Sequence, residues 1–282
     1  MADRLTHLAT FLRVAERGSL TAAARDLSVS QPTVTRAIAA LEAELGVPLF
    51  HRTTHSLALT ERGHDLLPRA RRLLAAWDGI AEDLAEGDAL SGPLHVIAPI
   101  ALGQTELIPV LTAFRAAHPD VPVNWQLTDA PVRLSETGAD LWIRVGPVPD
   151  DTLVQREVGR VDRHVYGAPA FADVPLETCP WITVGPYEGR HIALQGRTLD
   201  VAPVLNTNSI AVAVRAMAAG LGVAIAPDWY VRDDVAAGRI ARLGPPAASL
   251  PVHLAFAPER RTRRLDAFMA AVTERLRDRI LA

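Results

Sequence analysis

Apolar residues recur at helical spacing near the start of the chain, and they predict two helices joined by a short turn. Ser19 and Ser30 each precede such a run, where a serine favours an N-cap. In the second run Val34, Ile38 and Leu41 follow one another at spacings of 4 and 3, which places them on one buried stripe. Two short helices around a tight turn form a helix-turn-helix, although an ordinary helical hairpin with a solvated polar face gives the same pattern.

The leading end of the second predicted helix carries short hydrogen-bonding side chains and one guanidinium group. Such groups can reach the edges of bases in a major groove, where sequence is read. Pro32 fits the first helical turn, because an N–H group at that position would have no helical partner. The residues expected to contact DNA in this part are Thr21, Ser30, Gln31, Pro32, Thr33, Thr35 and Arg36.

The stretch after Pro48 alternates between apolar and polar residues and predicts a two-stranded hairpin. Its strands would be 49–52 and 56–60, and its tip is basic and rich in hydroxyl groups. A tip of that composition suits a wing that lies on the phosphate backbone or in a minor groove. The wing residues expected to contact DNA are Arg52, Thr53, Thr54 and His55. The hairpin favours a winged DNA-binding domain over an ordinary helical hairpin.

A long helix is expected after Thr60, which is placed to cap it. Its apolar residues alternate spacings of 4 and 3, which is typical of a two-stranded coiled coil. A single amphipathic helix packed on its own domain would give a similar stripe. Charged residues on both sides of the narrow stripe favour pairing of two chains. The expected dimerisation residues are Leu66, Ala70, Leu73, Trp77, Ile80 and Leu84.

Beyond residue 92 the pattern changes to short buried strands that alternate with helices. The preceding segment 86–93 is rich in glycine and polar residues and is expected to be a hinge. Alternation of this kind predicts a mostly parallel sheet with helices on its faces. The expected strands are 94–98, 121–128, 140–145, 165–167, 181–184, 201–207, 223–227 and 252–257, and the main expected helices are 103–118, 209–219, 229–236 and 262–281.

Charge is distributed unevenly along the 282 residues, whose formal net charge is −3. Residues 1–75 hold 10 arginines and 7 acidic residues, a net charge of +3, and the remainder holds 19 arginines and 25 acidic residues, a net charge of −6. This asymmetry fits a basic DNA-binding end followed by an acidic domain.

Metal, redox and membrane functions find little support in the sequence. The single cysteine, Cys179, excludes an internal disulfide and a multi-cysteine metal site, and it is interpreted as a small apolar filler. None of the nine histidines falls in a metal-ligand spacing. The chain has no signal-peptide segment and no apolar stretch of about 18 residues, so we expect a cytoplasmic protein without a membrane partner.

An enzymatic function is not expected. Gly220-Leu221-Gly222 resembles part of a dinucleotide loop, but it follows a predicted helix and precedes a strand, the reverse of the order that phosphate binding needs. No Gly-x-Ser-x-Gly motif occurs. The alternative is a cytoplasmic solute-binding or metabolic enzyme domain fused to a helical hairpin. No catalytic residues, metal ligands or cofactors are therefore expected.

These patterns resemble those of LysR-type transcriptional regulators, and the resemblance covers nearly the whole chain. The matching residues are densest in the DNA-binding part, and the sequence segments 139–146 and 219–227 extend the resemblance to the second half of the chain. The matching residues of the first part are Ser19, Ala22, Ala23, Leu27, Ser30–Thr35, Ile38, Leu41, Glu42, Leu45, Gly46, Leu49, Phe50, Arg52, Leu59, Thr60 and Gly63.

The resemblance implies the fold and the partners. It implies an all-α winged helix-turn-helix domain at 1–60, a linker and dimerisation helix at 61–88, and a two-lobed α/β effector-binding domain like periplasmic binding proteins at 92–282. Lobe one would comprise 92–161 and 261–282, and lobe two 162–260. The implied partners are double-stranded promoter DNA with an inverted repeat, a second copy in a homodimer that assembles to a tetramer, and a small-molecule effector.

The effector is expected between the lobes, beyond the carboxyl ends of the strands. The candidate residues are Pro99, Ile100, Ala101, Thr128, Asp129, Arg144, Val145, Thr207, Asn208 and Ser209. Asn208 and Ser209 are equally suited to capping a helix, and an arginine such as Arg144 is more often an ion-pair partner. Many relatives carry a hydroxyl in the first junction and use it to contact an anionic effector. Here 99–102 has none, which argues against a small carboxylate bound in that way and leaves open a more apolar effector, or no effector.

Overall fold

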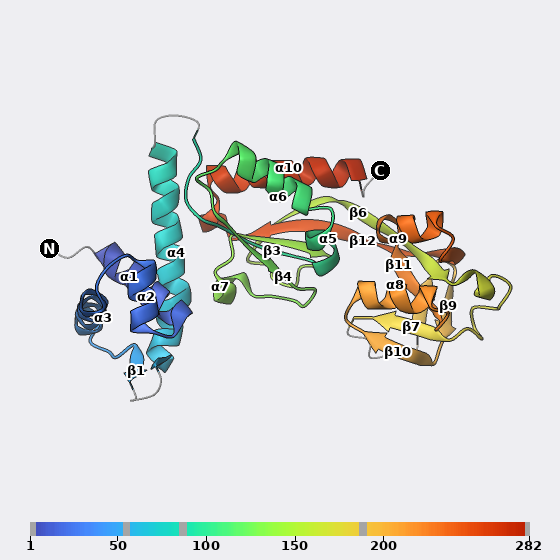
Figure 1. The fold of residues 1–282 in the computed structure, drawn as a ribbon, viewed down its shortest axis with the longest axis horizontal. Coiled ribbons are helices and arrows are strands. Elements are labelled where there is room, and N and C mark those ends of the chain that lie inside the picture. The colour runs from blue at the N-terminus through green and yellow to red at the C-terminus, as the bar shows by residue number, and fades with distance from the viewer. Residues whose placement is uncertain (1–3, 53–56, 85–88, 186–190, 280–282) are drawn as a thin grey trace.

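The computed structural model describes residues 4–52, 57–84, 89–185 and 191–279 (Figure 1). A small helical domain at the N-terminus lies beside one long helix, and an elongated α/β domain extends from the other side of that helix. None of the helices in these ranges is both long and apolar enough to cross a membrane.

The N-terminal domain consists of α1 (Arg4–Arg17), α2 (Leu20–Asp26), α3 (Gln31–Leu45), β1 (Phe50–Arg52) and β2 (Leu57–Leu59). Both predicted N-caps are confirmed, because Ser19 Oγ accepts a hydrogen bond from Ala22 N at 3.3 Å and Ser30 Oγ accepts one from Thr33 N at 3.4 Å. The apolar stripe of α3 is buried against Phe11 and Val14 of α1. The predicted wing strands are present and pair antiparallel.

Helix α4 (Glu61–Leu84) is the long helix, and Thr60 caps it by accepting a hydrogen bond from Gly63 N at 2.9 Å. One side of α4 packs on the N-terminal domain, and another side contacts α7 and the turn at 258–260 of the α/β domain. The helix thus joins the two parts of the chain.

Lobe one of the α/β domain contains β3 (Leu94–Ala98), α5 (Ile100–Gln104), α6 (Ile108–Ala117), β4 (Val123–Leu127), α7 (Leu134–Thr137) and β5 (Leu141–Val145). Strand β3 lies between β4 and β5 and is parallel to both. Helices α6 and α10 (Arg263–Arg279) lie side by side over one face of these strands (Figure 1). The prediction of a single helix at 103–118 is wrong. Helix α5 ends at Gln104 and α6 begins at Ile108, with Pro109 in its first turn, where proline is tolerated although it could not continue a preceding helix.

Lobe two contains β7 (Trp181–Val184), β8 (His191–Leu194), β9 (Arg197–Asp200), β10 (Pro203–Thr207), α8 (Ile210–Ala218), β11 (Val223–Pro227) and α9 (Asp228–Ala236), with short 3₁₀ turns at Pro169–Phe171 and Pro258–Arg260 elsewhere in the domain. Strand β7 pairs parallel with both β10 and β11. The strand predicted at 201–207 is shorter, because the residues before it form β9 in an antiparallel hairpin with β8.

Two long strands, β6 (Val154–Gly167) and β12 (Ala241–Phe256), run antiparallel through both lobes. They join the parallel strands of each lobe, so the described strands of the α/β domain form one mixed sheet in the order β10-β7-β11-β6-β12-β5-β3-β4, with β8 and β9 attached at β12. The return to lobe one predicted near Arg260 is wrong, because Val252–Ala255 already pair with β5. The predicted strands 165–167 and 252–257 are only the ends of β6 and β12.

Candidate DNA interface and effector cleft

The leading end of α3 presents polar side chains to solvent. Gln31, Pro32, Thr33 and Arg36 are exposed, and Thr35 is half-buried. The buried residues Val34, Ile38 and Leu41 hold the opposite face of α3 against the domain core. Thr21, on α2, and Ser30 are exposed as well. The structure therefore brings the helix-turn-helix residues expected at DNA onto the solvent side of the domain.

Local hydrogen bonds organise this polar end before any DNA is present. The hydroxyl groups of Ser30 and Thr33 lie 2.8 Å apart, and Thr35 Oγ1 donates to the Gln31 carbonyl at 3.1 Å. Arg36 Nε donates to the Pro32 carbonyl at 3.4 Å. The Gln31 amide makes no hydrogen bond to the described residues and can pair with a base edge in two places.

The wing is described only in part. Strands β1 and β2 pair over Phe50–Arg52 and Leu57–Leu59. The predicted contacts Thr53, Thr54 and His55 lie outside the described residues, as does the side chain of Arg52.

The apolar stripe of α4 divides between two environments. Ala70 is buried in the core of the N-terminal domain, so the prediction that it lies in the dimerisation seam is wrong. Leu66 packs against that core but is only half-buried, and its place in the seam stays a prediction. Leu73, Trp77 and Ile80 are 51%, 53% and 53% exposed. Leu84 is the last residue of α4, and its side chain lies outside the description. An unpaired apolar surface therefore follows the C-terminal half of the helix.

Part of the predicted effector site is held together in lobe one. Asp129 Oδ1 accepts a hydrogen bond from Ile100 N at 3.1 Å, and Arg144 Nη1 donates to the Asp129 carbonyl at 2.6 Å. Thr128 N donates to the Ala98 carbonyl at 3.0 Å, next to the buried Pro99. The ends of β3, β4 and β5 thus place Pro99, Ile100, Ala101, Thr128, Asp129 and Arg144 at one edge of lobe one.

The guanidinium group of Arg144 is partly buried at this edge of lobe one and lies over an aromatic ring. Its guanidinium carbon lies 5.4 Å from the centre of the buried Trp142 ring. Burial lowers the pKa of Arg144, against the opposing effect of the Asp129 carboxylate. The Nε atom is buried and makes no hydrogen bond to the described residues. A buried guanidinium N–H without a partner favours binding of a carboxylate or carbonyl oxygen. Val145 points to the other face and packs on the lobe-one core.

The lobe-two part of the predicted site is a helix N-terminus. Ser209 N donates to Thr207 Oγ1 at 3.2 Å, and Ser209 Oγ accepts a hydrogen bond from Val212 N at 3.4 Å. Asn208 between them is exposed. Capping of α8 is therefore one role of Ser209. Among the described residues, no hydrogen bond or ion pair joins this group to the Asp129–Arg144 group.

Trp229 was not predicted as a site residue, yet it connects the lobes. It belongs to α9 of lobe two but packs against the core of lobe one, and its Nε1 atom is buried without a hydrogen bond to the described residues. Asp228 before it accepts hydrogen bonds from Tyr166 at 3.0 Å and Arg242 at 2.9 Å, and lies 2.8 Å from His164. Asp228 directly follows strand β11, and a charged residue at the end of a largely buried strand is the sequence signal that could have indicated these contacts.

The contacts between the linker helix and lobe one were not predicted either. Arg71 Nη1 of α4 donates to the Glu136 carbonyl at 3.0 Å, and the guanidinium lies 3.8 Å from Glu16 of α1. Arg260 forms a buried ion pair with Asp140 at 2.7 Å beside this contact. The residues are far apart in sequence, and an Arg on the polar side of a helix gives no local signal of such a contact.

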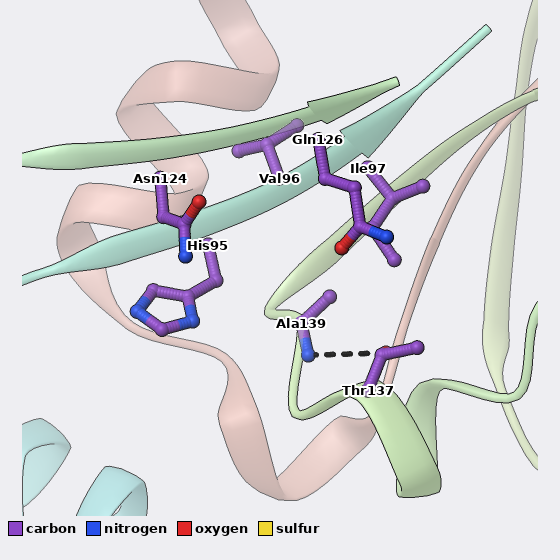
Figure 2. Close-up of a pocket in the computed structure, with 7 residues that line it drawn as sticks. All are labelled: His95, Val96, Ile97, Asn124, Gln126, Thr137 and Ala139. Atoms are coloured by element: carbon purple, nitrogen blue, oxygen red, sulfur yellow. Dashed lines mark hydrogen bonds between the residues drawn. The ribbon is translucent and has the colours of Figure 1, made fainter. Parts of the chain in front are cut away.

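Two cavities lie along the end of the lobe-one sheet that faces α4. The smaller, about 40 Å³, is lined by His95, Val96, Ile97, Asn124, Gln126, Thr137 and Ala139 (Figure 2). It is too small for an organic effector, since such sites measure roughly 300–1,000 Å³. The larger, about 380 Å³, lies between α1, α4 and lobe one. Neither is lined by the residues predicted to bind the effector.

Comparison with known proteins identifies the class to which this architecture belongs. Residues 5–64 match the family described as bacterial regulatory helix-turn-helix protein, lysR family. Residues 87–277 match the LysR substrate binding domain. Both matches agree with the division of the structure into a helix-turn-helix domain and a two-lobed α/β domain. The chain belongs to the LysR family and is a LysR-type transcriptional regulator with an effector-binding domain.

Individual relatives agree with this assignment. The HTH-type transcriptional activator AaeR of Escherichia coli is 30% identical over 263 residues, which cover 88% of this chain and 85% of AaeR. An HTH-type transcriptional regulator of Xanthomonas campestris is 34% identical over 176 residues, 61% of this chain and 51% of that protein. The fold is similar to a full-length OxyR variant from Pseudomonas aeruginosa, with a TM-score of 0.73, 22% identity and coverage of 98% and 95%.

Proposed function

We propose that the chain acts in the cytoplasm as a dimer that reads an inverted repeat in promoter DNA. The exposed apolar surface of α4 at Leu73, Trp77 and Ile80 would pair two chains. Two copies of α3 would then enter successive major grooves, each with Gln31 at its leading end. Two such dimers would form the tetramer that the family resemblance implies.

We further propose that the effector is a small organic molecule with one anionic or carbonyl end, and that the protein needs no cofactor and catalyses no reaction. The observation that carries this proposal is the buried Arg144 Nε atom at the end of β5, which makes no hydrogen bond to the described residues. Ile100 and Ala101 add an apolar wall. A molecule with a polar end for Arg144 and an apolar body suits this combination.

Footprinting of the DNA upstream of the gene that encodes this protein tests the proposal that it binds an inverted repeat in promoter DNA. Protection of two half-sites about one helical turn apart is expected for a dimer of helix-turn-helix domains. Turnover of metabolites by the purified protein, with no protection of promoter DNA, would contradict the proposal.

The double variant Asn208→Ala, Ser209→Ala tests the effector cleft. We expect it to abolish the response to the inducer while operator binding persists. Removal of the Ser209 cap costs roughly 1 kcal/mol, so the melting temperature is measured alongside. Arg144→Gln is a second variant that leaves the α8 cap intact and should also lose the response. A folded protein that binds DNA and responds fully in both variants would move the effector site elsewhere.

A further inference from the structure

The pairing of the two long strands is irregular where they pass from one lobe to the other. Of the described strands, β6 and β12 are the two that run through both lobes. Their register shifts between Ala247 and Leu250 and again between Val252 and His253. Shifts of this kind interrupt the ladder of hydrogen bonds and bend a strand. Strands β6 and β12 therefore connect the lobes but do not by themselves fix the angle between them.

Helix α9 supplies a further contact between the lobes through Trp229. The helix belongs to lobe two and lies next to β6 (Figure 1). Val231 of α9 is fully buried in the core of lobe two, whereas the Trp229 side chain packs against the core of lobe one. A tryptophan removes a large apolar area from water when it is buried. One side chain of α9 thus holds lobe two on lobe one, while another holds α9 in lobe two.

Asp228, the first residue of α9, ties the start of this helix to both long strands. Its Oδ1 atom accepts a hydrogen bond from Tyr166 of β6 at 3.0 Å and lies 2.8 Å from Nδ1 of His164 on the same strand. Its Oδ2 atom accepts a hydrogen bond from Arg242 of β12 at 2.9 Å. Burial raises the pKa of Tyr166, so the hydroxyl group keeps the proton that it donates. This network fixes the backbone from which the Trp229 side chain extends toward lobe one.

The inserted position of Trp229 combines a gain and a cost in free energy. Burial of the ring is favourable. The Nε1 atom, however, is buried and makes no hydrogen bond to the described residues. A buried N–H group without an acceptor is less stable than one in contact with water. Because these two effects oppose each other, the contact can be released more readily than one between purely apolar side chains.

We propose that the start of α9 is a latch between the lobes, with Trp229 as the inserted part and Asp228 as its anchor. The angle between the lobes then changes only when Trp229 leaves the core of lobe one. An effector in the cleft would act by favouring either the inserted or the released position. This inference goes beyond the proposed function, because neither residue belongs to the proposed effector site. The latch holds without an effector, so its test does not depend on where an effector binds.

Double electron–electron resonance between spin labels on the two lobes tests the latch in the full-length protein. The labels are attached at Ala270→Cys on α10 of lobe one and at Ala219→Cys after α8 of lobe two, both exposed positions. The native Cys179 is removed by Cys179→Ala. Labelled chains are diluted with an excess of unlabelled chains, so that only distances within one chain are measured. We expect one narrow distance distribution in this labelled parent and a broader or displaced one after Trp229→Ala.

Three further variants separate the latch from the general stability of α9. Val231→Ala is the matched control, because it removes apolar packing of the same helix inside lobe two alone, and it should give the distribution of the parent. Trp229→Phe should do so too, since it keeps an aromatic ring in lobe one and removes the unpaired N–H group. Asp228→Ala leaves Trp229 in place but removes its anchor, and it should broaden the distribution. Circular dichroism establishes that each variant is folded.

The outcomes that would overturn the latch are defined for each variant. An unchanged distance distribution in a folded Trp229→Ala protein would overturn it. If Trp229→Ala does not fold, an unchanged distribution after Asp228→Ala has the same meaning. Equal broadening after Val231→Ala would also overturn the latch, because the angle between the lobes would then depend on packing within lobe two and not on the contact with lobe one.

Discussion

Arg71 of the linker helix donates a 3.0 Å hydrogen bond to the backbone carbonyl of Glu136 in lobe one. The segment that contains Glu136 begins at Asp129, which bonds Ile100 and Arg144 at the effector cleft, and ends at Asp140, which pairs with Arg260. This one segment therefore contacts both the cleft and the linker helix. A movement of Asp129 caused by an effector has a short physical connection to the helix that positions the DNA-binding domain.

Gly138 is expected to be essential for the contact between α4 and lobe one. Its φ of +71° strains any residue with a side chain, and an added Cβ would meet Cδ of Arg71. Gly238 has nearly the same φ, +69°, with nothing within 4 Å of the added atom. Gly238→Ala should cost about 1 kcal/mol from backbone strain alone, whereas Gly138→Ala should cost clearly more and displace Arg71. Denaturant unfolding of the two variants measures the difference, and equal losses would contradict a role for the Arg71 contact.

Local signals in the sequence predicted the local structure well. The caps at Ser19, Ser30 and Thr60 and the buried stripe of α3 depend on residues a few positions apart, and the structure confirms them. The order of strands and helices in the α/β domain follows from short apolar runs in the same way. The family resemblance added the two-lobed architecture, which periodicity alone does not specify.

The errors concern contacts between residues that are distant in sequence. The lengths of β6 and β12 depend on their mutual pairing across both lobes, so their sequences alone showed only the ends. Ala70 belongs to a regular stripe but packs on the N-terminal domain, because that domain covers the first half of α4. Arg71 and Glu136 are 65 positions apart, and no pattern in either segment indicates their contact.

Pairing through α4 should depend on the exposed half of its apolar stripe. Leu73→Asp together with Trp77→Asp places two charges on that surface, so we expect dissociation of the dimer and a large loss of operator affinity. Leu221→Asp, at a residue of lobe two that is 47% exposed, is the control for the effect of a charge on an exposed apolar residue. Light scattering measures the assembly. An oligomer that persists in the double variant would exclude α4 as the pairing surface.

Sequence readout should depend on Gln31 more than on Arg36. Removal of a side chain that pairs with a base edge costs about 1–3 kcal/mol at the cognate site and little on random DNA. We therefore expect Gln31→Ala to reduce the ratio of specific to non-specific affinity. Arg36→Ala is the comparison, because loss of a phosphate contact weakens binding to all sequences and lowers its salt dependence. Titrations on both kinds of DNA at several salt concentrations separate the two, and an equal loss on both DNAs for Gln31→Ala would show that Gln31 does not read bases.

His95 should make the protein less stable in mild acid. Burial lowers the pKa of His95 below its ordinary value of 6.5, with Asp140 and Glu16 opposing this effect and Arg260 and Arg71 adding to it. Well above pH 6.5 the imidazole is neutral in both the folded and the unfolded chain, so it has no effect on the pH dependence of the free energy of unfolding. As the pH falls below that value, the unfolded chain takes up the proton first, and the free energy of unfolding decreases until the pH passes the folded-state pKa.

His95→Gln removes this titration. The stability of the parent relative to the variant should therefore fall between pH 7.5 and pH 5.5, by an amount that thermal or urea unfolding at the two pH values measures. His64→Gln, at an exposed histidine of α4, is the control for the effect of replacing a histidine outside the contact between α4 and lobe one. If the parent instead gains stability relative to His95→Gln in acid, the carboxylates of Asp140 and Glu16 outweigh burial, and the protonated imidazole strengthens the contact between α4 and lobe one.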